Sequence, residues 1–225
     1  MALPTLPAVV ESNSDITDAT TYTTASFTPK PGHTYLVSVA VTGTAIGTVS
    51  LSGNGITWTN EISQLHGTVR RNTLLYGVAN GASTTGAITI TCTTTSLRCY
   101  WIISEVSGTR TSDPIEASSS TSGGPTTSGS IALAAFSHAA NASFGAIYCS
   151  SNTGENVVPG TGFTEIEESA SSEPGTLENE WQLADDDPDW TFTSSNWAAI
   201  GAQIAVGFPA RNRVINQAVK RAAYW

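Results

Sequence analysis

Residues Arg98–Val106 read RCYWIISEV, and this stretch decides the fold class. It is the most apolar of the candidate strands, and an unbroken apolar run fits a strand buried on both faces better than strict alternation does. The upstream stretch Thr34–Thr42, TYLVSVAVT, alternates large apolar residues with small ones, which predicts a strand with one buried face. We therefore expect a β-protein with a central strand at 98–106.

The rest of the chain continues this pattern of short strands separated by turn residues. The strongest turn signals are Pro29-Lys30-Pro31-Gly32, Gly53-Asn54-Gly55 and Asn80-Gly81. Further strands are expected at 48–51, 56–59, 74–79, 87–93, 131–136, 143–150, 160–168, 182–184, 189–193 and 197–206. This spacing predicts an all-β sandwich or jelly roll and argues against alternating strands and helices.

The pattern divides the chain into three segments. Residues 1–29 form an N-terminal segment, residues 30–208 the sandwich, and residues 209–225 a C-terminal arm. Within the sandwich, residues 109–130 read TRTSDPIEASSSTSGGPTTSGS. This composition of Ser, Thr, Gly and Pro predicts a long loop or weakly ordered link that joins two halves.

Charge is distributed unevenly along the chain, whose formal net charge is −9. Of the nine Lys and Arg residues, four lie in the last fifteen positions, which hold no acid, so the remainder carries −13. Ten of the eighteen acids fall between Glu165 and Asp189. The asymmetry predicts an acidic body that repels nucleic acid and a basic arm that meets a different, acidic partner.

The arm has its own pattern, because its apolar residues recur at helical spacing from Asn212 onward. We expect a short helical or extended arm outside the sandwich, and an isolated helix of this length needs a surface to pack on. Its aromatic and Arg-rich composition is typical of an interface anchor, and the alternative is a mobile terminus. The predicted partner-binding residues are Arg211, Arg213, Val214, Ile215, Val219, Lys220, Arg221, Tyr224 and Trp225.

Catalytic motifs are missing from the sequence. It holds no nucleophile elbow, no zinc-protease motif and no phosphate-binding glycine loop, and its three histidines are far apart. Glu165 and Glu167 would share one face of a strand, as a glycosidase pair could, but no cleft or row of sugar-stacking rings accompanies them. We expect a protein that is not an enzyme and that holds no metal or cofactor.

Two patterns in the acidic half of the chain, an aspartate run and a group of tryptophans, each allow two interpretations. The run at 185–189, DDDPD, offers hard oxygen ligands for Ca²⁺ but lacks the spacing and glycine of an EF-hand, and the alternative is a solvated acidic loop. Trp181, Trp190 and Trp197 lie among Asp, Asn and Gln, a composition found at glycan-binding sites. The alternative is that these three rings belong to the core.

Cysteines and the N-terminus bear on the compartment. Cys92 and Cys99 could face each other across a hairpin, and free buried thiols, with Cys149 as the third, are the favoured interpretation. The start, MALPTLPAVVESNSD, lacks the basic region and apolar core of a signal peptide, and no apolar run approaches the roughly 20 residues of a membrane span. We expect a protein made and kept in the cytoplasm unless lysis releases it, with no membrane partner.

Several blocks resemble a β-sandwich module of tailed-phage virion proteins and some bacterial surface proteins. They are GNGITWT (53–59), LLYGVANG followed by AITIT (74–91), WIISEVSGTRTSDPIEAS (101–118), GTGFTEIEE (160–168) and AAIGAQIAVGF (198–208). Together they span most of residues 30–208. The resemblance implies a structural or adhesive role, and it carries over no catalytic residues.

The resemblance leads to a specific hypothesis, a phage virion structural protein assembled in the host cytoplasm. We expect a capsid decoration (cement) protein that stabilises the shell by binding the major capsid protein or another virion protein. A homo-oligomer, with a trimer as the first guess, would cover part of its sheet edges. The alternatives are a tail, fibre or baseplate protein that binds host glycans, and a carbohydrate-active enzyme.

Overall fold

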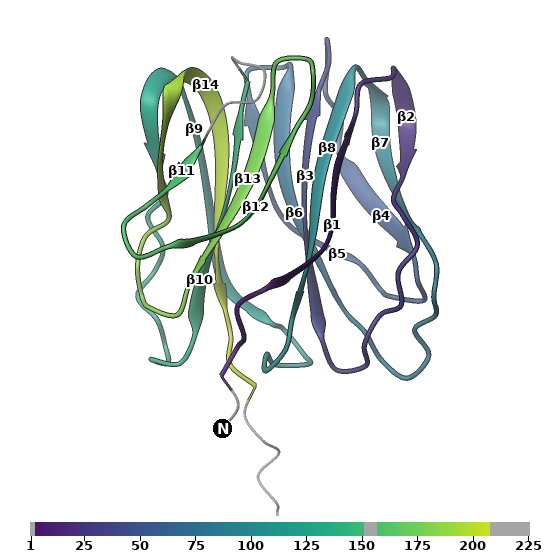
Figure 1. The fold of residues 1–225 in the computed structure, drawn as a ribbon, viewed down its shortest axis with the longest axis vertical. Helices are drawn as coiled ribbons and strands as arrows, with labels where there is room; N and C mark the ends of the chain where they lie inside the picture. Colours follow the sequence, from purple (N-terminus) through teal and green to yellow (C-terminus); the bar gives the residue numbers. More distant parts are fainter. Residues whose placement is uncertain (1–2, 151–156, 208–225) are drawn as a thin grey trace, which may run out of the picture.

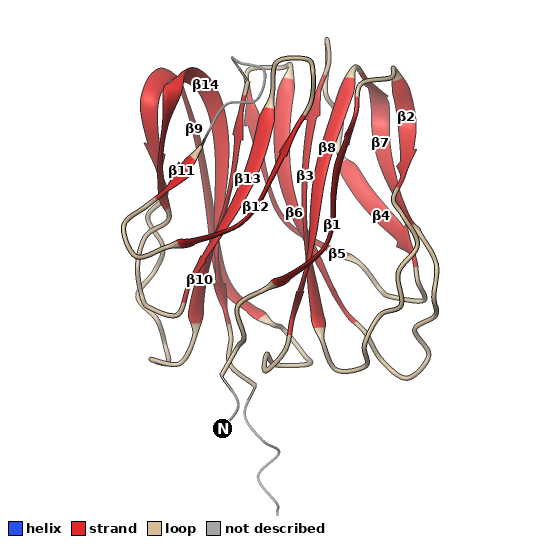
Figure 2. Ribbon diagram, viewed as in Figure 1, coloured by secondary structure: helices blue, strands red, loops and turns tan. Residues whose placement is uncertain are grey.

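The computed structural model describes residues 3–150 and 157–207, and within these residues it contains strands, turns and loops but no helix (Figure 2). The strands form three antiparallel sheets, which lie side by side as layers of a sandwich (Figure 1). The expected all-β sandwich is confirmed. No helix in the described part of the chain is long and apolar enough to cross a membrane.

The middle sheet has the strand order β1-β8-β3-β6-β5. Its strands are β1 (Ala8–Asp15), β8 (Arg98–Val106), β3 (Thr34–Thr42), β6 (Arg70–Val78) and β5 (Thr59–His66). Both its faces are covered, because Val37 and Val39 pack in one core cluster and Leu36 in another. The central, doubly buried strand expected at 98–106 is confirmed.

The burial expected for residues 34–42 was wrong, since all nine residues of β3 are buried. Its small residues, Ser38 and Ala40, face a second layer instead of solvent. The small side chains of β3 therefore mark a face on which a second sheet packs closely. The alternation of large and small residues had predicted that this face is exposed.

The small outer sheet covers one face of the middle sheet. It consists of β2 (Ala19–Thr23), β7 (Ile88–Ser96) and β4 (Val49–Gly53), in the order β2-β7-β4. The core between these two sheets is apolar, and Tyr22, Val49, Ile88 and Ile90 from the small sheet contribute to it. Burial of this surface is the main stabilising contribution on this side.

The large outer sheet covers the other face of the middle sheet. Its path runs β11 (Val158–Pro159), β14 (Asp189–Ile204), β10 (Ala142–Cys149), β13 (Thr176–Gln182) and β12 (Thr164–Ala170), and β9 (Ile115–Ser130) pairs with β14. Asn72 of the middle sheet ties the two layers together, because its Nδ2 donates to the carbonyl oxygens of Ala146 (3.1 Å) and Ala198 (3.2 Å).

Residues 109–130 are not the loop that their composition predicted. β9 occupies 115–130 and pairs along the 16-residue strand β14, with irregular register between Thr191 and Trp197. The two strands arch over at one end of the molecule (Figure 1). The extended pairing satisfies the backbone of β9, so the segment needs few apolar side chains to be ordered.

The strand expected at 131–136 was also wrong, because none is present there. This segment is held by side chains of the acidic run: Leu133 N donates to Asp187 Oδ1 (2.8 Å) and Phe136 N to Asp185 Oδ2 (3.0 Å). Those carboxylates satisfy backbone groups that a sheet would otherwise satisfy.

All three cysteines, Cys92, Cys99 and Cys149, are buried and form no disulfide within the described residues, as expected. Cys92 lies on β7 of the small outer sheet and Cys99 on β8 of the middle sheet, so they do not face each other across a hairpin. Burial raises the pKa of both thiols, which keeps them protonated.

The described chain begins and ends at the same end of the sandwich (Figure 1). Thr5 N donates to Ser107 O (3.1 Å), and Gly207 N donates to Gly108 O (2.7 Å). The N-terminal residues thus belong to the sandwich through β1 and β2. The predicted arm at 209–225 lies outside the described residues.

Candidate anion-binding site

A row of three polar side chains crosses the end of the middle sheet. Thr42, the last residue of β3, is the register partner of Arg70 on β6 and of Arg98 on β8. Residues directly opposite each other in an antiparallel pair point to the same face. That face is the one covered by the large outer sheet, because Ala40 and Tyr100, two residues along the same strands and so on the same face, pack there.

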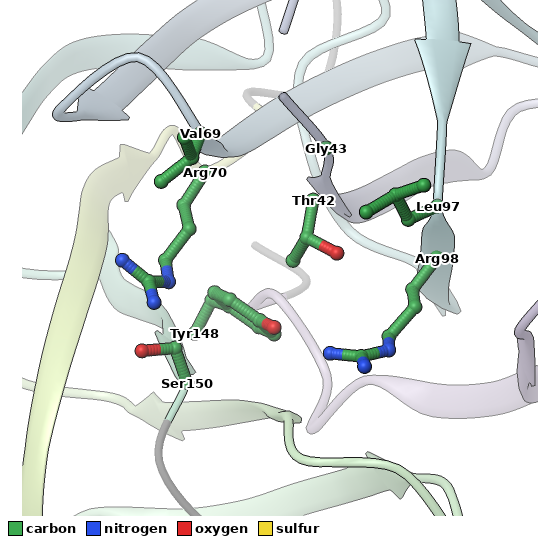
Figure 3. Close-up of a pocket in the computed structure, with 8 residues that line it drawn as sticks. All are labelled: Thr42, Gly43, Val69, Arg70, Leu97, Arg98, Tyr148 and Ser150. Carbon is green, nitrogen blue, oxygen red and sulfur yellow. The ribbon is translucent and has the colours of Figure 1, made fainter. Parts of the chain in front are cut away.

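The large outer sheet completes the site from the opposite side. Tyr148 and Ser150, at the end of β10, line a cavity of about 140 Å³ together with the row. Gly43, Val69 and Leu97 form the rest of its wall (Figure 3). The cavity lies at the end of the sandwich opposite to the N-terminus and Gly207.

Three hydroxyl groups of this cavity have no hydrogen-bond partner among the described residues. They are Thr42 Oγ1, the Tyr148 hydroxyl and Ser150 Oγ, and all three atoms are buried. Buried polar atoms in folded proteins almost always have a partner, which is a protein group, a water or a ligand. Each of these hydroxyls can donate one hydrogen bond into the cavity.

The two arginines differ in how much of their charge is already matched. Arg98 donates through Nη2 to Glu173 Oε2 (3.0 Å) and through Nη1 to Pro174 O (3.2 Å). Arg70 makes no salt bridge with any residue that the structure describes. The cavity therefore holds one guanidinium with a partner and one without, in a body that is otherwise acidic.

Tyr148 is held in place by close packing. Its ring lies 5.5 Å from that of Tyr100, and the backbone of Gly175 approaches both hydroxyls so closely that an added Cβ would lie 2.6 Å from each. Burial raises the pKa of Tyr148, and the charges of Arg70 and Arg98 offset only part of this. The phenol consequently stays protonated and remains a donor.

The arrangement is that of a binding site for an anion. Two guanidinium groups and three hydroxyls all offer N–H or O–H donors, and guanidinium groups bind carboxylate and phosphate oxygens in pairs. No pattern in the sequence pointed to these residues as a site. Arg98 begins the apolar stretch at 98–106, and Arg70 precedes the strand expected at 74–79. Only the register of β3 with β6 and β8 brings the two arginines together.

The three tryptophans proposed for glycan binding do not form one site. Trp181 packs between the middle and large outer sheets, whereas Trp190 and Trp197 pack on the other face of the large sheet. Their exposed fractions are 2%, 1% and 8%. The Trp190 indole N–H donates to Glu178 Oε2 at 2.5 Å, and that of Trp197 to Thr126 Oγ1 at 2.8 Å. These rings act mainly as core side chains.

The glutamate pair expected on one face, Glu165 and Glu167, was wrong. A register shift between these residues sets Glu165 opposite Glu180, Glu167 opposite Asn179 and Glu168 opposite Glu178. Because Glu178 and Glu180 are two residues apart on β13, they share a face, and Glu165 and Glu168 lie on it too.

Glu178 and Glu180 are fully buried on that face. Burial is the largest cause that raises the pKa of Glu178 far above its usual range, and nearby acidic groups act in the same direction. Burial and nearby acidic groups together raise the pKa of Glu180 to about 9. Both carboxyl groups are therefore protonated at neutral pH.

The acidic run at 185–189 has structural contacts. Besides the bonds to residues 133 and 136, Asp186 Oδ1 accepts from Asp187 N (2.9 Å). Within the ranges 3–150 and 157–207, no group of three or more His, Cys, Asp or Glu side chains is arranged to hold a metal ion. The predicted anchor residues Arg211, Arg213, Val214, Ile215, Val219, Lys220, Arg221, Tyr224 and Trp225 lie outside those ranges.

Comparisons with protein families, with curated proteins and with solved structures give no match for this chain.

Proposed function

We propose that the chain is a virion structural protein of a tailed phage, of the capsid decoration type, and that it acts by binding and assembly. The observation that carries the proposal is the contrast between the body and the segment after it. The body ends in backbone hydrogen bonds at Gly207, and residues 208–225 then hold four cations and no acid. A basic, partly apolar segment that follows a rigid acidic body suits attachment to an acidic partner.

The surface where the body ends supports this proposal. Leu3 and Leu6 are each 52% exposed, and the carbonyl group of Leu3 lies against Gly108, the partner of Gly207. A cavity of about 290 Å³ includes Gly207 in its wall and is lined otherwise by Thr109, Arg110, Thr111 and Ser112. Exposed leucines are the kind of surface that a protein partner covers.

Co-sedimentation with intact capsids that lack this protein tests the proposal. We expect the full-length chain to pellet with the capsids and a 1–208 chain to stay in the supernatant. Because Gly207 makes the last backbone hydrogen bond among the described residues, the truncation should leave the melting temperature of the body unchanged. Lost attachment would then not be lost folding.

A matched control keeps the full length and replaces Arg211, Arg213, Lys220 and Arg221 with Gln. We expect it to bind more weakly than the wild type and to lose the salt dependence of attachment. Equal attachment by the 1–208 chain would reject the arm as anchor. If the full-length chain does not attach, the decoration function itself is rejected.

A second candidate, a tail or fibre protein that binds host glycans, has one observation in its favour. A cavity of about 350 Å³ runs along the paired strands β9 and β14 and is lined by Trp190, Trp197, Asp189, Thr121, Ser128, Ser130 and Thr191. Glycan-array binding that Asp189→Asn abolishes would favour this candidate. The substitution keeps both rings and removes one exposed carboxylate.

A further inference from the structure

We propose that the cavity between Arg70 and Arg98 binds a small organic carboxylate. The inference is independent of attachment through the arm, because the cavity lies at the Thr42 end of β3, whereas Gly207 lies at the Thr34 end, beside Thr109. It rests on the donors, the charge and the size of the cavity.

The donors select a ligand that accepts hydrogen bonds. The hydroxyls of Thr42, Tyr148 and Ser150 are buried without a partner in the described structure, and the burial of Tyr148 is complete. A carboxylate is acceptor-only and offers about four lone-pair positions, so it can satisfy several of these donors at once. Charge-assisted hydrogen bonds of this kind are among the strongest that proteins form.

The charge selects a monoanion. Glu173 already balances Arg98 at 3.0 Å, so the cavity has one guanidinium, that of Arg70, without an ion partner among the described residues. A carboxylate balances that single charge. A phosphate dianion would leave an excess of negative charge at a partly buried site, where unbalanced charge is costly.

The positions of the two arginines suggest how a ligand would lie. Figure 3 shows Arg98 on the side of the Tyr148 hydroxyl and Arg70 beside Ser150, with the tyrosine ring between them. The cavity of about 140 Å³ has room for roughly four or five water-sized groups. A small acid fits this space, or the acidic end of a sugar acid, but a folded protein segment does not.

Titration of the full chain with sodium glucuronate tests the proposal. Glucose is the uncharged matched sugar, acetate the carboxylate without a ring, and inorganic phosphate the competing oxyanion, all at constant ionic strength. Amide chemical shifts give both the affinity and the location. We expect saturable shifts with glucuronate around residues 42, 70, 98 and 148, and none with glucose.

Variants of the cavity make the test specific. Arg70→Gln should weaken glucuronate binding by about tenfold or more, and Tyr148→Phe by about three- to tenfold, as expected for a charged and a neutral hydrogen bond. The control is Arg71→Gln, since Arg71 points to the opposite face of β6 and donates to Ser63 Oγ (2.8 Å). It removes the same charge one residue away and should leave the affinity unchanged.

Each outcome decides the proposal. Acetate and glucuronate binding equally well would support a site that reads the carboxylate alone, and tighter binding of glucuronate would support added contacts to the ring. Phosphate binding more tightly than either would overturn the assignment to a carboxylate. Absence of saturation with every anion, or an equal loss in Arg71→Gln, would overturn the site, provided that the melting temperatures show folded variants.

Discussion

Glu105 on β8 and Glu180 on β13 are both buried carboxyl groups in the sheets of one sandwich, but their surroundings are opposite. Glu105 accepts from Lys30 Nζ at 2.7 Å, from the Tyr35 hydroxyl at 2.8 Å and contacts His33 Nδ1 at 2.9 Å. Glu180 accepts from the backbone N–H of Gly160 at 3.2 Å, and its other oxygen has no partner in the described structure.

The ionisation of the two groups follows from these partners. Burial would raise the pKa of Glu105, but the hydrogen bonds from Lys30, Tyr35 and His33, with the charge of Lys30, lower it below its usual value. Burial, together with the charges of Asp189 and Asp186, raises the pKa of Glu180 to about 9. Burial alone therefore does not decide the charge state; the supply of cationic donors does.

The two sites must also respond to pH in opposite directions. Glu105 has a lowered pKa when folded, so its contribution is present above its ordinary pKa and is lost as pH falls through the folded value. Glu180 has a raised pKa when folded, so its contribution is fully present below 4.5, its ordinary value, and is lost as pH rises toward 9. Substitutions at the two sites can test this contrast.

The largest expected effect is that of Glu180→Gln on the pH dependence of stability. Between pH 4.5 and 9 the folded chain holds a proton on Glu180 that the unfolded chain has lost. Each pH unit then lowers the free energy of unfolding by about 1.4 kcal/mol per such group. Gln keeps the shape without titrating, so the variant should lose stability less steeply in urea unfolding at pH 5, 7 and 9.

Glu167→Gln is the matched control for that experiment. Glu167 lies on the neighbouring strand, opposite Asn179 and on the other face from Glu180. We expect its pH profile to follow the wild type. If Glu180→Gln followed the wild type as well, Glu180 would be ionised in the folded chain and the contrast with Glu105 would disappear.

The next largest effect is expected for Trp190→Phe. The substitution removes the indole N–H that donates to Glu178 Oε2 and keeps an aromatic ring against Gly145. Loss of one buried hydrogen bond costs about 1–3 kcal/mol. Because that bond lowers the pKa of Glu178, its loss should extend the fall of stability with rising pH to a higher pH, without making the fall steeper. Thermal unfolding from pH 5 upward measures both effects.

Trp197→Phe serves as the comparison for Trp190→Phe, because the Trp197 indole donates to the hydroxyl of Thr126 and not to a carboxyl group. It should lower the melting temperature without moving the pH at which the fall of stability ends. The same end point in both variants would mean that the Trp190 bond does not influence the ionisation of Glu178.

The sequence predicted the fold class because the apolar strands carry a strong local signal. Residues 98–106 were placed correctly in their bounds and their burial. β9 was missed because its order comes from pairing with β14, a long-range contact that leaves no apolar pattern in its own serines and threonines. Likewise, the small residues of β3 read as an exposed face, although a second sheet covers them.

The candidate site was beyond the reach of sequence patterns for a related reason. Arg70 and Arg98 are 28 positions apart, and each is an ordinary polar residue at the end of a strand. Only their register with Thr42 makes them neighbours in one row. A local irregularity in a strand is just as hard to predict from the sequence. The register shift between Glu165 and Glu167 decides which glutamates lie opposite Glu178 and Glu180.

The smallest effect is expected for Lys30→Met at the Glu105 site. The Lys30 side chain is 65% exposed, so solvent screens its ion pair, and surface pairs of this kind contribute about 0.2–1 kcal/mol. Tyr35 and His33 still contact Glu105 in the variant. The urea midpoint should fall slightly at pH 7 and match the wild type at acid pH, where Glu105 is protonated in both proteins. Lys30→Arg, which keeps the charge, should recover part of the difference. A loss at pH 7 larger than that of Trp190→Phe would mean that one exposed cation determines the ionisation of Glu105, and that the hydrogen bonds from the buried tyrosine and from His33 do not.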